Sequence, residues 1–287
     1  MSKISKALEK AAKDRFTKVV QERPTVRYRD PVKVAESRID PHVVVYHDPH
    51  SPIAEQYKTL RTNLQALSAK QPIRTLGLTS AINSEGKTLT SINLAATMAQ
   101  NDQKRIVLVD CDLRRGSIRQ VLGLQEQPGV SEILSEGYPL DQALVQTQIP
   151  NLTILPAGAT PDNPTELLDS HRMRGLIKDL REQFDLAIFD TPPIIPLTDA
   201  GVLGANMDGM ILVVQSGRTQ RKLVVQADDI LRNLNIRTLG FILTHADYFV
   251  PKYGYGYYYG YRPDQKKAAT GPANGGQDKK KPEQESE

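Results

Sequence analysis

A short loop ending in lysine and threonine is the first part of the sequence that could do chemistry. Residues 80–88 read Ser-Ala-Ile-Asn-Ser-Glu-Gly-Lys-Thr and lie between an apolar run and a segment of helical periodicity. In such a strand–loop–helix context, backbone N–H groups and the helix N-terminus surround phosphate oxygens. Lys87 then supplies positive charge to the β- and γ-phosphates, and the Thr88 hydroxyl can ligate Mg²⁺. The loop predicts a nucleoside triphosphate site, although a Gly-Lys-Thr string also occurs by chance and Ala81 replaces the usual first glycine.

Three carboxylates stand at the ends of two other apolar runs. Asp110 and Asp112 come at the end of the run that begins at residue 105, and Asp190 ends the run that begins at residue 186. Ligands of open parallel sheets bind at the carboxyl ends of strands, so these acids are expected to face the same crevice as the loop. A single aspartate there is more often a helix cap or a turn residue. Two strand ends beside a phosphate loop favour Mg²⁺ binding over a structural role for all three acids.

These residues need a scaffold that brings the ends of parallel strands together. Between residues 51 and 247, strand-like apolar runs alternate with helical patterns, which is typical of βαβ units. The prediction is an α/β fold like that of P-loop NTPases, with a mostly parallel sheet and helices on both faces. The expected strands are 74–79, 105–110, 152–156, 186–190, 209–214 and 238–243. The expected helices are 52–67, 87–100, 164–183, 199–206 and 219–234.

Composition excludes several classes of protein. With 39% hydrophobic and 24% charged residues among 287, the chain is neither wholly disordered nor collagen-like. The formal charge of +4 suits a phosphate ligand and gives no reason to expect nucleic acid. Cys111 is the only cysteine, so no internal disulfide can form and a cytoplasmic location is expected. No run approaches the roughly 20 apolar residues of a membrane span, so any membrane role is expected to use a partner or a surface helix.

The chain divides into three zones. Residues 1–50 are expected to form a basic N-terminal arm interrupted by prolines, and residues 51–247 the domain that carries the chemistry. Residues 248–287 lose all periodicity and are expected to be a flexible, disordered tail, because their Gly-, Lys- and Gln-rich composition cannot bury enough apolar area. This tail holds a tyrosine cluster interleaved with glycines, in which the candidate acceptors are Tyr253, Tyr255, Tyr257, Tyr258, Tyr259 and Tyr261.

Taken together, the motifs resemble those of a known family. Residues 81–88, 107–112 and 187–193 are similar to the Walker A, Walker A′ and Walker B motifs of the bacterial tyrosine kinases (BY-kinases) of capsule and exopolysaccharide systems. The segments 55–64 and 155–168 agree with the same family, as does the tyrosine cluster. The resemblance covers about residues 51–261, and the combination is far more specific than any one motif.

The resemblance implies a kinase that transfers the γ-phosphoryl group of ATP, with Mg²⁺, to tyrosines of its own tail. In that scheme Lys87 neutralises phosphate charge, Asp110 accepts or orients the tyrosine proton, and Asp112 and Asp190 hold Mg²⁺ together with Thr88. Glu55, Lys58 and Arg61 share one side of a helix, which the family uses to build a ring in which one subunit's tail enters the next subunit's site. The expected nucleotide contacts are Ala81, Asn83, Ser84, Glu85, Gly86, Lys87, Thr88 and Thr244.

The family also implies partners that this sequence does not itself contain. They are a membrane chain-length-determinant or polysaccharide copolymerase protein, which activates the kinase and recruits it to the inner face of the plasma membrane, and a cognate tyrosine phosphatase. The role implied for such a kinase is regulation of polysaccharide polymerisation and export. For the helix that carries Glu55, a solvated charged face is the alternative to a ring interface.

Some positions depart from the family pattern. Asn83 and Ser84 replace the usual Pro-Gly of the loop, which changes the rigidity expected of it without removing a phosphate contact. Lys58 replaces an arginine and loses its planar fork. Thr244 stands where the family often has an asparagine that reads adenine, so the resemblance does not predict which nucleotide base this chain selects.

Two functions from other classes compete with the kinase. One is a partitioning or positioning ATPase of the deviant-Walker group, which acts as a dimerisation switch on binding ATP. That group carries an extra lysine early in its loop, and residues 82–85 contain none. The other is a non-catalytic scaffold whose tyrosine tail binds partners by stacking, but such a scaffold has no need of Lys87, Thr88 and three acids.

Overall fold

A computed structural model of the chain describes residues 39–100 and 104–246. The expected arm therefore lies outside the described residues up to residue 38, and so does the tyrosine cluster. The helices are α2 (Val44–His47), α3 (Pro52–Lys70), α4 (Lys87–Ala99), α5 (Ser117–Val121), α6 (Val130–Glu136), α7 (Leu140–Ala143), α8 (Pro164–Leu168), α9 (His171–Gln183), α10 (Asp199–Gly204) and α11 (Arg221–Asn233). The strands are β1 (Thr75–Ser80), β2 (Ile106–Asp110), β3 (Val145–Gln146), β4 (Leu152–Leu155), β5 (Leu186–Asp190), β6 (Gly209–Gln215) and β7 (Thr238–Thr244).

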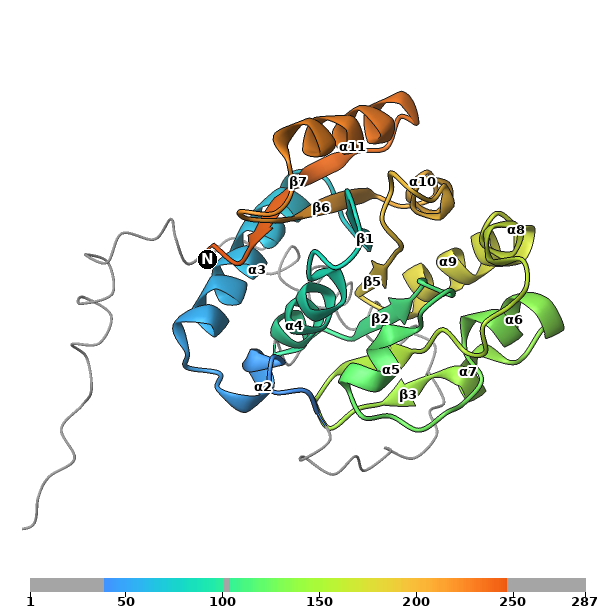
Figure 1. The fold of residues 1–287 in the computed structure, drawn as a ribbon. Coiled ribbons are helices and arrows are strands. Elements are labelled where there is room, and N and C mark those ends of the chain that lie inside the picture. The colour runs from blue at the N-terminus through green and yellow to red at the C-terminus, as the bar shows by residue number, and fades with distance from the viewer. Residues whose placement is uncertain (1–38, 101–103, 247–287) are drawn as a thin grey trace, which may run out of the picture. The chain divides into compact units, whose positions relative to one another are not determined.

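A single seven-stranded sheet organises the described residues, in the order β3-β4-β2-β5-β1-β6-β7 (Figure 1). All neighbouring strands pair in parallel except β3 and β4, which are antiparallel. Strands β2, β5 and β1 are neighbours, so their carboxyl ends lie side by side at one edge of the sheet. The predicted α/β fold with a mostly parallel sheet is confirmed.

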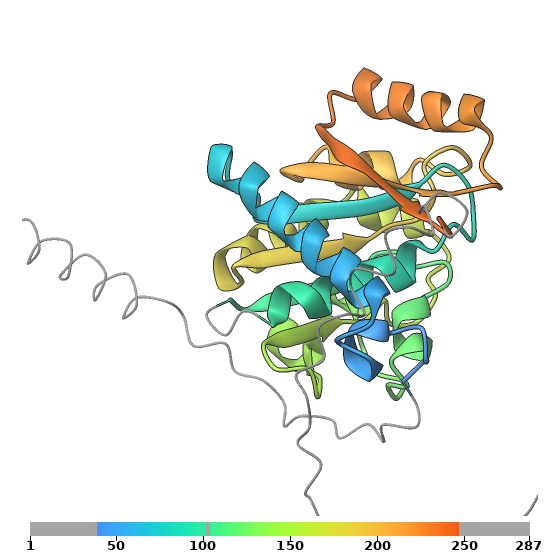
Figure 2. The same ribbon diagram turned by 90° about the vertical axis from the view of Figure 1, so that its left-hand side faces the viewer.

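Alternate residues of the central strands feed two separate hydrophobic layers. On β2, Ile106 and Leu108 pack with α3 and α4, whereas Val107 and Val109 pack with α6 and α9. On β6, Met210 and Leu212 pack against α10 and α11. Strands buried on both faces read as continuous apolar runs, which is why they stood out in the sequence. Figure 2 shows α3 crossing one face of the sheet while α11 covers the strands at its end.

The segment just before α3 packs onto the domain. Val43 and Val45 are buried in the same hydrophobic layer as α4. The Asn93 side chain of α4 accepts a hydrogen bond from the Val45 N–H and donates one to the His42 carbonyl, at 3.1 and 3.0 Å. Of the arm expected over residues 1–50, the part that the structure describes is thus attached to the helix that follows the phosphate loop.

The expected strands and most of the expected helices are present within a few residues of their predicted ends. The helix expected over residues 164–183 is wrong as a single element, because it is divided into α8 and α9. The Ser170 side chain accepts a hydrogen bond from the Met173 N–H at 3.2 Å and so caps a new helix. Among the described residues, no helix combines the length and the apolar character that crossing a membrane requires.

Candidate active site at the carboxyl edge of the sheet

The loop between β1 and α4 has the conformation of a phosphate-binding loop. Ser84 and Gly86 both have positive φ angles, of 62° and 86°, and α4 begins directly afterwards at Lys87. The first N–H groups of α4 lie at the end of this loop, because the helix begins there. The Lys87 side chain, which is 7% exposed, comes from the same position. This arrangement provides both the dipole and the charge that bind an anion.

Two of the predicted acids meet at the ends of neighbouring strands. β2 and β5 pair in a register that sets Asp110 directly beside Asp190, and both side chains are fully buried. β5 also pairs with β1, which leads into the phosphate loop. The sheet thus brings together the loop and the acids that the sequence placed at separate strand ends.

Asp190 faces the phosphate loop. Its Oδ2 accepts a 2.6 Å hydrogen bond from the Thr88 hydroxyl, whereas its Oδ1 is buried and has no hydrogen-bond partner in the part of the chain that the structure describes. Burial raises the pKa of this carboxyl, while the positive charge of Lys87 and the nearby hydroxyls of Thr88 and Ser91 act in the opposite direction. A buried carboxylate oxygen without a partner is rare and costly, which points to a ligand outside the polypeptide.

Asp110 is held in a different way. Its Oδ1 accepts from the Asp112 N–H at 3.2 Å, and its Oδ2 accepts from the Ile118 N–H at 3.0 Å. Burial raises the pKa of Asp110 well above its ordinary value, and the nearby charge of Asp190 raises it further. Both of its oxygens are thus engaged with the main chain of the turn that leads into α5.

Asp112 is slightly less buried than Asp110 and Asp190. It is 6% exposed, and the positive charges of Lys87 and Arg115 both act on it. Burial raises the pKa of Asp112, and these two charges partly offset that shift. Asp112 therefore combines partial access to solvent with proximity to the lysine of the phosphate loop.

The residues present fit a magnesium ion. Mg²⁺ is usually held by one or two carboxylates, a hydroxyl, water and substrate phosphates rather than by a cage of protein ligands. No cluster of three or more His, Cys, Asp or Glu side chains arranged to hold a metal lies in residues 39–100 and 104–246. Thr88, Asp190 and Asp112 would hold the ion, which supplies charge neutralisation for a transferred phosphoryl group.

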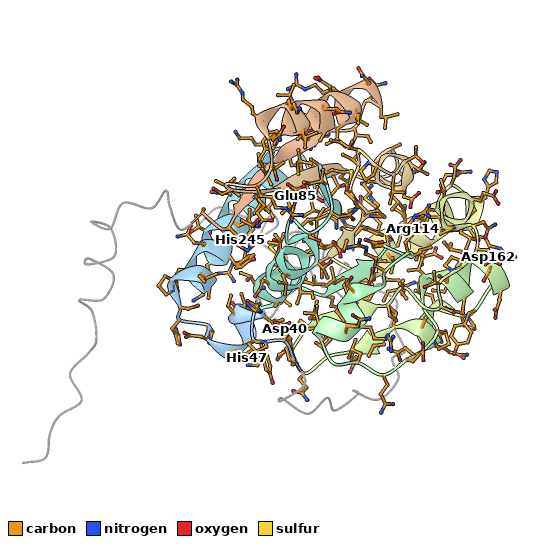
Figure 3. All side chains as sticks on the ribbon, viewed as in Figure 1. Asp40, His47, Glu85, Arg114, Asp162 and His245 are labelled. Atoms are coloured by element: carbon orange, nitrogen blue, oxygen red, sulfur yellow. The ribbon has the colours of Figure 1, made fainter. Side chains whose placement is uncertain are left out.

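Thr244, expected at the nucleotide, ends β7 next to the phosphate loop. Its hydroxyl donates a hydrogen bond to the Glu85 carbonyl oxygen at 2.9 Å. The Glu85 side chain, also expected at the nucleotide, is fully buried, and its carboxylate accepts hydrogen bonds from within the protein. Figure 3 labels Glu85, and also His245, which directly follows Thr244.

The three residues of the expected oligomer interface lie on α3, away from the acids. Lys58 donates to Glu55 Oε1 at 2.6 Å and to the Pro49 carbonyl at 2.9 Å. Arg61 donates to the Thr97 carbonyl of α4 at 3.0 Å. The Arg61 contact links α3 to α4, and the ring interface stays a prediction.

Sequence reasoning missed a second polar cluster beside the acids. Arg114, labelled in Figure 3, donates through Nε to Asp199 Oδ2 and through Nη2 to Thr165 Oγ1, both at 3.0 Å. Thr165 in turn donates to Asp199 Oδ1 at 2.6 Å. Thr165 and Asp199 were visible only as signals for helix starts, and nothing in their spacing indicated that α8 and α10 approach Arg114.

Comparison with known proteins shows which family has this sequence and fold. A family model described as an AAA domain matches residues 83–226. The chain is 34% identical over 218 residues to tyrosine-protein kinase YwqD of Bacillus subtilis, covering 74% of this chain and 92% of that protein. It is 34% identical to tyrosine-protein kinase wzc of Salmonella typhi, of which it spans only 30%. The solved kinase domain of Escherichia coli tyrosine kinase ETK superposes with a TM-score of 0.69 at 28% identity, covering 77% of this chain and 87% of that one.

Proposed function

The chain belongs to the family of bacterial tyrosine kinases, and on that premise we propose that it is an ATP-dependent protein-tyrosine autokinase. Its acceptors are tyrosines of its own C-terminal segment, which lies outside the described residues and enters the proposal through its sequence. The proposed acceptors are Tyr253, Tyr255, Tyr257, Tyr258, Tyr259 and Tyr261.

The observation that carries the proposal is the grouping of Lys87, Thr88 and Asp190. A buried carboxylate with one unpartnered oxygen stands beside a hydroxyl and a lysine at a helix start. Phosphoryl transfer depends mainly on charge neutralisation and positioning, and this group supplies both for a Mg²⁺-bound triphosphate. The family resemblance gives the tyrosine proton to Asp110, each of whose oxygens already accepts one main-chain N–H group.

The proposed oligomer, activator and phosphatase are those that the family resemblance implies. The proposed kinase forms a ring in which each tail enters the next subunit's site. A membrane copolymerase protein activates it at the inner face of the plasma membrane, and a phosphatase reverses the reaction. Each phosphotyrosine adds about −1.5 to −2 charges, so six of them bring about −10 to a chain of formal charge +4. Such a change favours dissociation of the ring, which would link phosphorylation to polysaccharide polymerisation and export.

Intact-mass spectrometry after incubation with Mg·ATP tests the activity. Wild type is expected to gain several phosphoryl groups that map to the tyrosine cluster. Lys87→Met, which lacks the charge at the phosphates, and a variant with all six tyrosines changed to Phe are expected to gain none. Wild type that hydrolyses ATP but gains no mass, even with the cytoplasmic segment of a copolymerase added, would overturn the autokinase.

The two inactive variants also test transfer between subunits. Lys87→Met keeps the tyrosines but lacks the catalytic lysine, and the six-Phe variant keeps the site but lacks acceptors. Mixing them is expected to restore phosphorylation on the Lys87→Met chain, which mass distinguishes from its partner. A mixture as inactive as its components, beside an active wild type, would instead mean transfer within one chain.

A further inference from the structure

The carbonyl groups of the phosphate loop have partners on its outer side. A loop that turns its N–H groups toward phosphate must turn carbonyls the other way, and each of these also needs a hydrogen bond. The Ser84 carbonyl accepts from Arg218 Nη1 at 2.7 Å, and the Glu85 carbonyl accepts from Thr244 Oγ1 at 2.9 Å. Both donors come from segments more than a hundred residues away in the sequence.

The Glu85 carboxylate ties the loop to the segment that carries Arg218. This side chain is fully buried, and its Oε2 accepts from the Ile82 N–H of the loop at 2.8 Å. Its Oε1 accepts from the Gln215 N–H at 3.3 Å and from the Thr219 hydroxyl. A carboxylate with its oxygens engaged in this way holds the loop to the end of β6 and is not directed at a ligand.

The supporting segments are themselves held in place by the sheet. Gln215 and Thr244 are paired residues at the ends of β6 and β7, and the Ser216 N–H donates to the Thr244 carbonyl at 2.9 Å. Arg218 also donates to the Gln215 side chain at 3.1 Å. Thr244 packs closely on the loop, since a methyl group added at Gly86 would lie 3.5 Å from Thr244 Cγ2. The loop therefore contacts a hydrogen-bonded support formed by β6, β7 and residues 216–219.

We propose that Arg218 and Thr244 are positioning residues for the nucleoside triphosphate. They act through the Ser84 and Glu85 carbonyls and hold the N–H groups of the loop toward the phosphates before the nucleotide arrives. Preorganisation of this kind strengthens binding because less ordering is left to the binding step. Thr244 thus supports recognition of the phosphates, in contrast to the adenine-reading role that its position suggested in the sequence.

The proposal rests on the proposed function only in requiring that the loop binds nucleoside phosphates. It is tested by calorimetric titration of the full chain with Mg·ATP, Mg·GTP and Mg·tripolyphosphate, which has no base. The variants are Arg218→Gln, whose shorter side chain draws the donor back from the Ser84 carbonyl, and Thr244→Val, which removes the hydroxyl that donates to the Glu85 carbonyl. Arg221→Gln, at the exposed first residue of α11, is the matched control for loss of charge near the loop.

Arg218→Gln and Thr244→Val are each expected to weaken all three ligands by the same factor of roughly three to ten, as for the loss of one hydrogen bond. Arg221→Gln is expected to bind as wild type does. Unchanged affinities would overturn the proposal. So would a Thr244→Val variant that alters the preference for ATP over GTP but leaves tripolyphosphate unaffected, because that pattern belongs to a base reader.

These titrations require no phosphoryl transfer, so the two proposals fail separately. Wild type that binds nucleotide but never phosphorylates tyrosine would refute the autokinase and leave the support of the loop intact. Wild type that phosphorylates its tail, with both variants binding all three ligands as it does, would refute the positioning roles alone.

Discussion

Asp110 and Asp190 end neighbouring strands in the same register, yet their carboxylates have opposite surroundings. Both oxygens of Asp110 accept main-chain N–H groups. Asp190 accepts one hydroxyl, and its other oxygen has no partner in the described part of the chain. Each acid ends a buried apolar strand, so the segment beyond the strand decides which partners its oxygens have. Both oxygens of Asp110 are held by main-chain N–H groups, whereas one oxygen of Asp190 is available to a ligand.

The difference comes from the segment that the chain forms after each strand. After β2 the chain turns into α5, whose N-cap residue is Gly116 and has no side chain with which to cap the helix. The Asp110 carboxylate takes that place by accepting from the Ile118 N–H of the first turn. After β5 no helix begins until α10 at Asp199, so Asp190 stays directed at Thr88 of the phosphate loop.

The largest effect that separates the two acids is expected from Asp190→Asn. Tyrosine phosphorylation should fall on the order of 10²-fold or more, because an amide is a poor ligand for Mg²⁺. The free energy of unfolding should not fall, because the change removes a buried carboxylate that has an unpartnered oxygen. Phosphorylation rates and urea unfolding measure the two quantities. Asp228→Asn, on α11 and paired with Arg232, is the matched control, and an Asp190→Asn rate close to wild type would remove the assigned role.

The next effect, from Asp110→Asn, should appear in stability. An amide has one oxygen for two N–H donors, so one buried N–H group loses its partner at a cost of about 1–3 kcal/mol. Urea unfolding of the metal-free protein measures this loss, and residual phosphorylation should stay well above that of Asp190→Asn. If Asp110→Asn unfolds like wild type but loses activity as completely as Asp190→Asn, then Asp110 takes part in the chemistry as the family resemblance implies.

Much of this arrangement could be predicted because it depends on local sequence patterns. Buried parallel strands are continuous apolar runs, and the phosphate loop is defined by its own residues, so the six parallel strands and Lys87 were predicted from the sequence. The two-residue antiparallel strand β3 was not, because it is too short to show a pattern. Which oxygen of Asp110 or Asp190 accepts a hydrogen bond depends on where main-chain N–H groups lie in the folded chain. Local sequence patterns do not give those positions. The contacts of Arg114 with Asp199 and of Arg218 with Ser84 join distant segments, and no spacing rule connects them.

The smallest effect is a change in the pH dependence of stability, seen only as a difference between variants. Burial raises the pKa values of the Asp110 and Asp190 pair, so the folded protein binds protons more readily than the unfolded chain. Stability contributed by this pair therefore rises as pH falls and is lost as pH rises through the folded pKa. Asp208 behaves oppositely. Its partial burial acts to raise its pKa, but hydrogen bonds from Arg74 and Thr75 outweigh burial and lower it, so its contribution is lost at low pH.

Urea unfolding of metal-free wild type, Asp190→Asn and Asp208→Asn between about pH 3 and 7.5 resolves these signs. Wild type gains stability on acidification through its carboxylate pair, so any stability advantage of Asp190→Asn should shrink as pH falls. The stability deficit of Asp208→Asn should stay constant above about pH 5 and shrink only below it, because wild type loses what Asp208 contributes as pH falls through its lowered folded pKa. An Asp190→Asn advantage that grows as pH falls would mean that the pair is ionised and satisfied in the folded protein. The contrast between Asp190 and Asp110 would then have to come from the bound ligand and not from the fold.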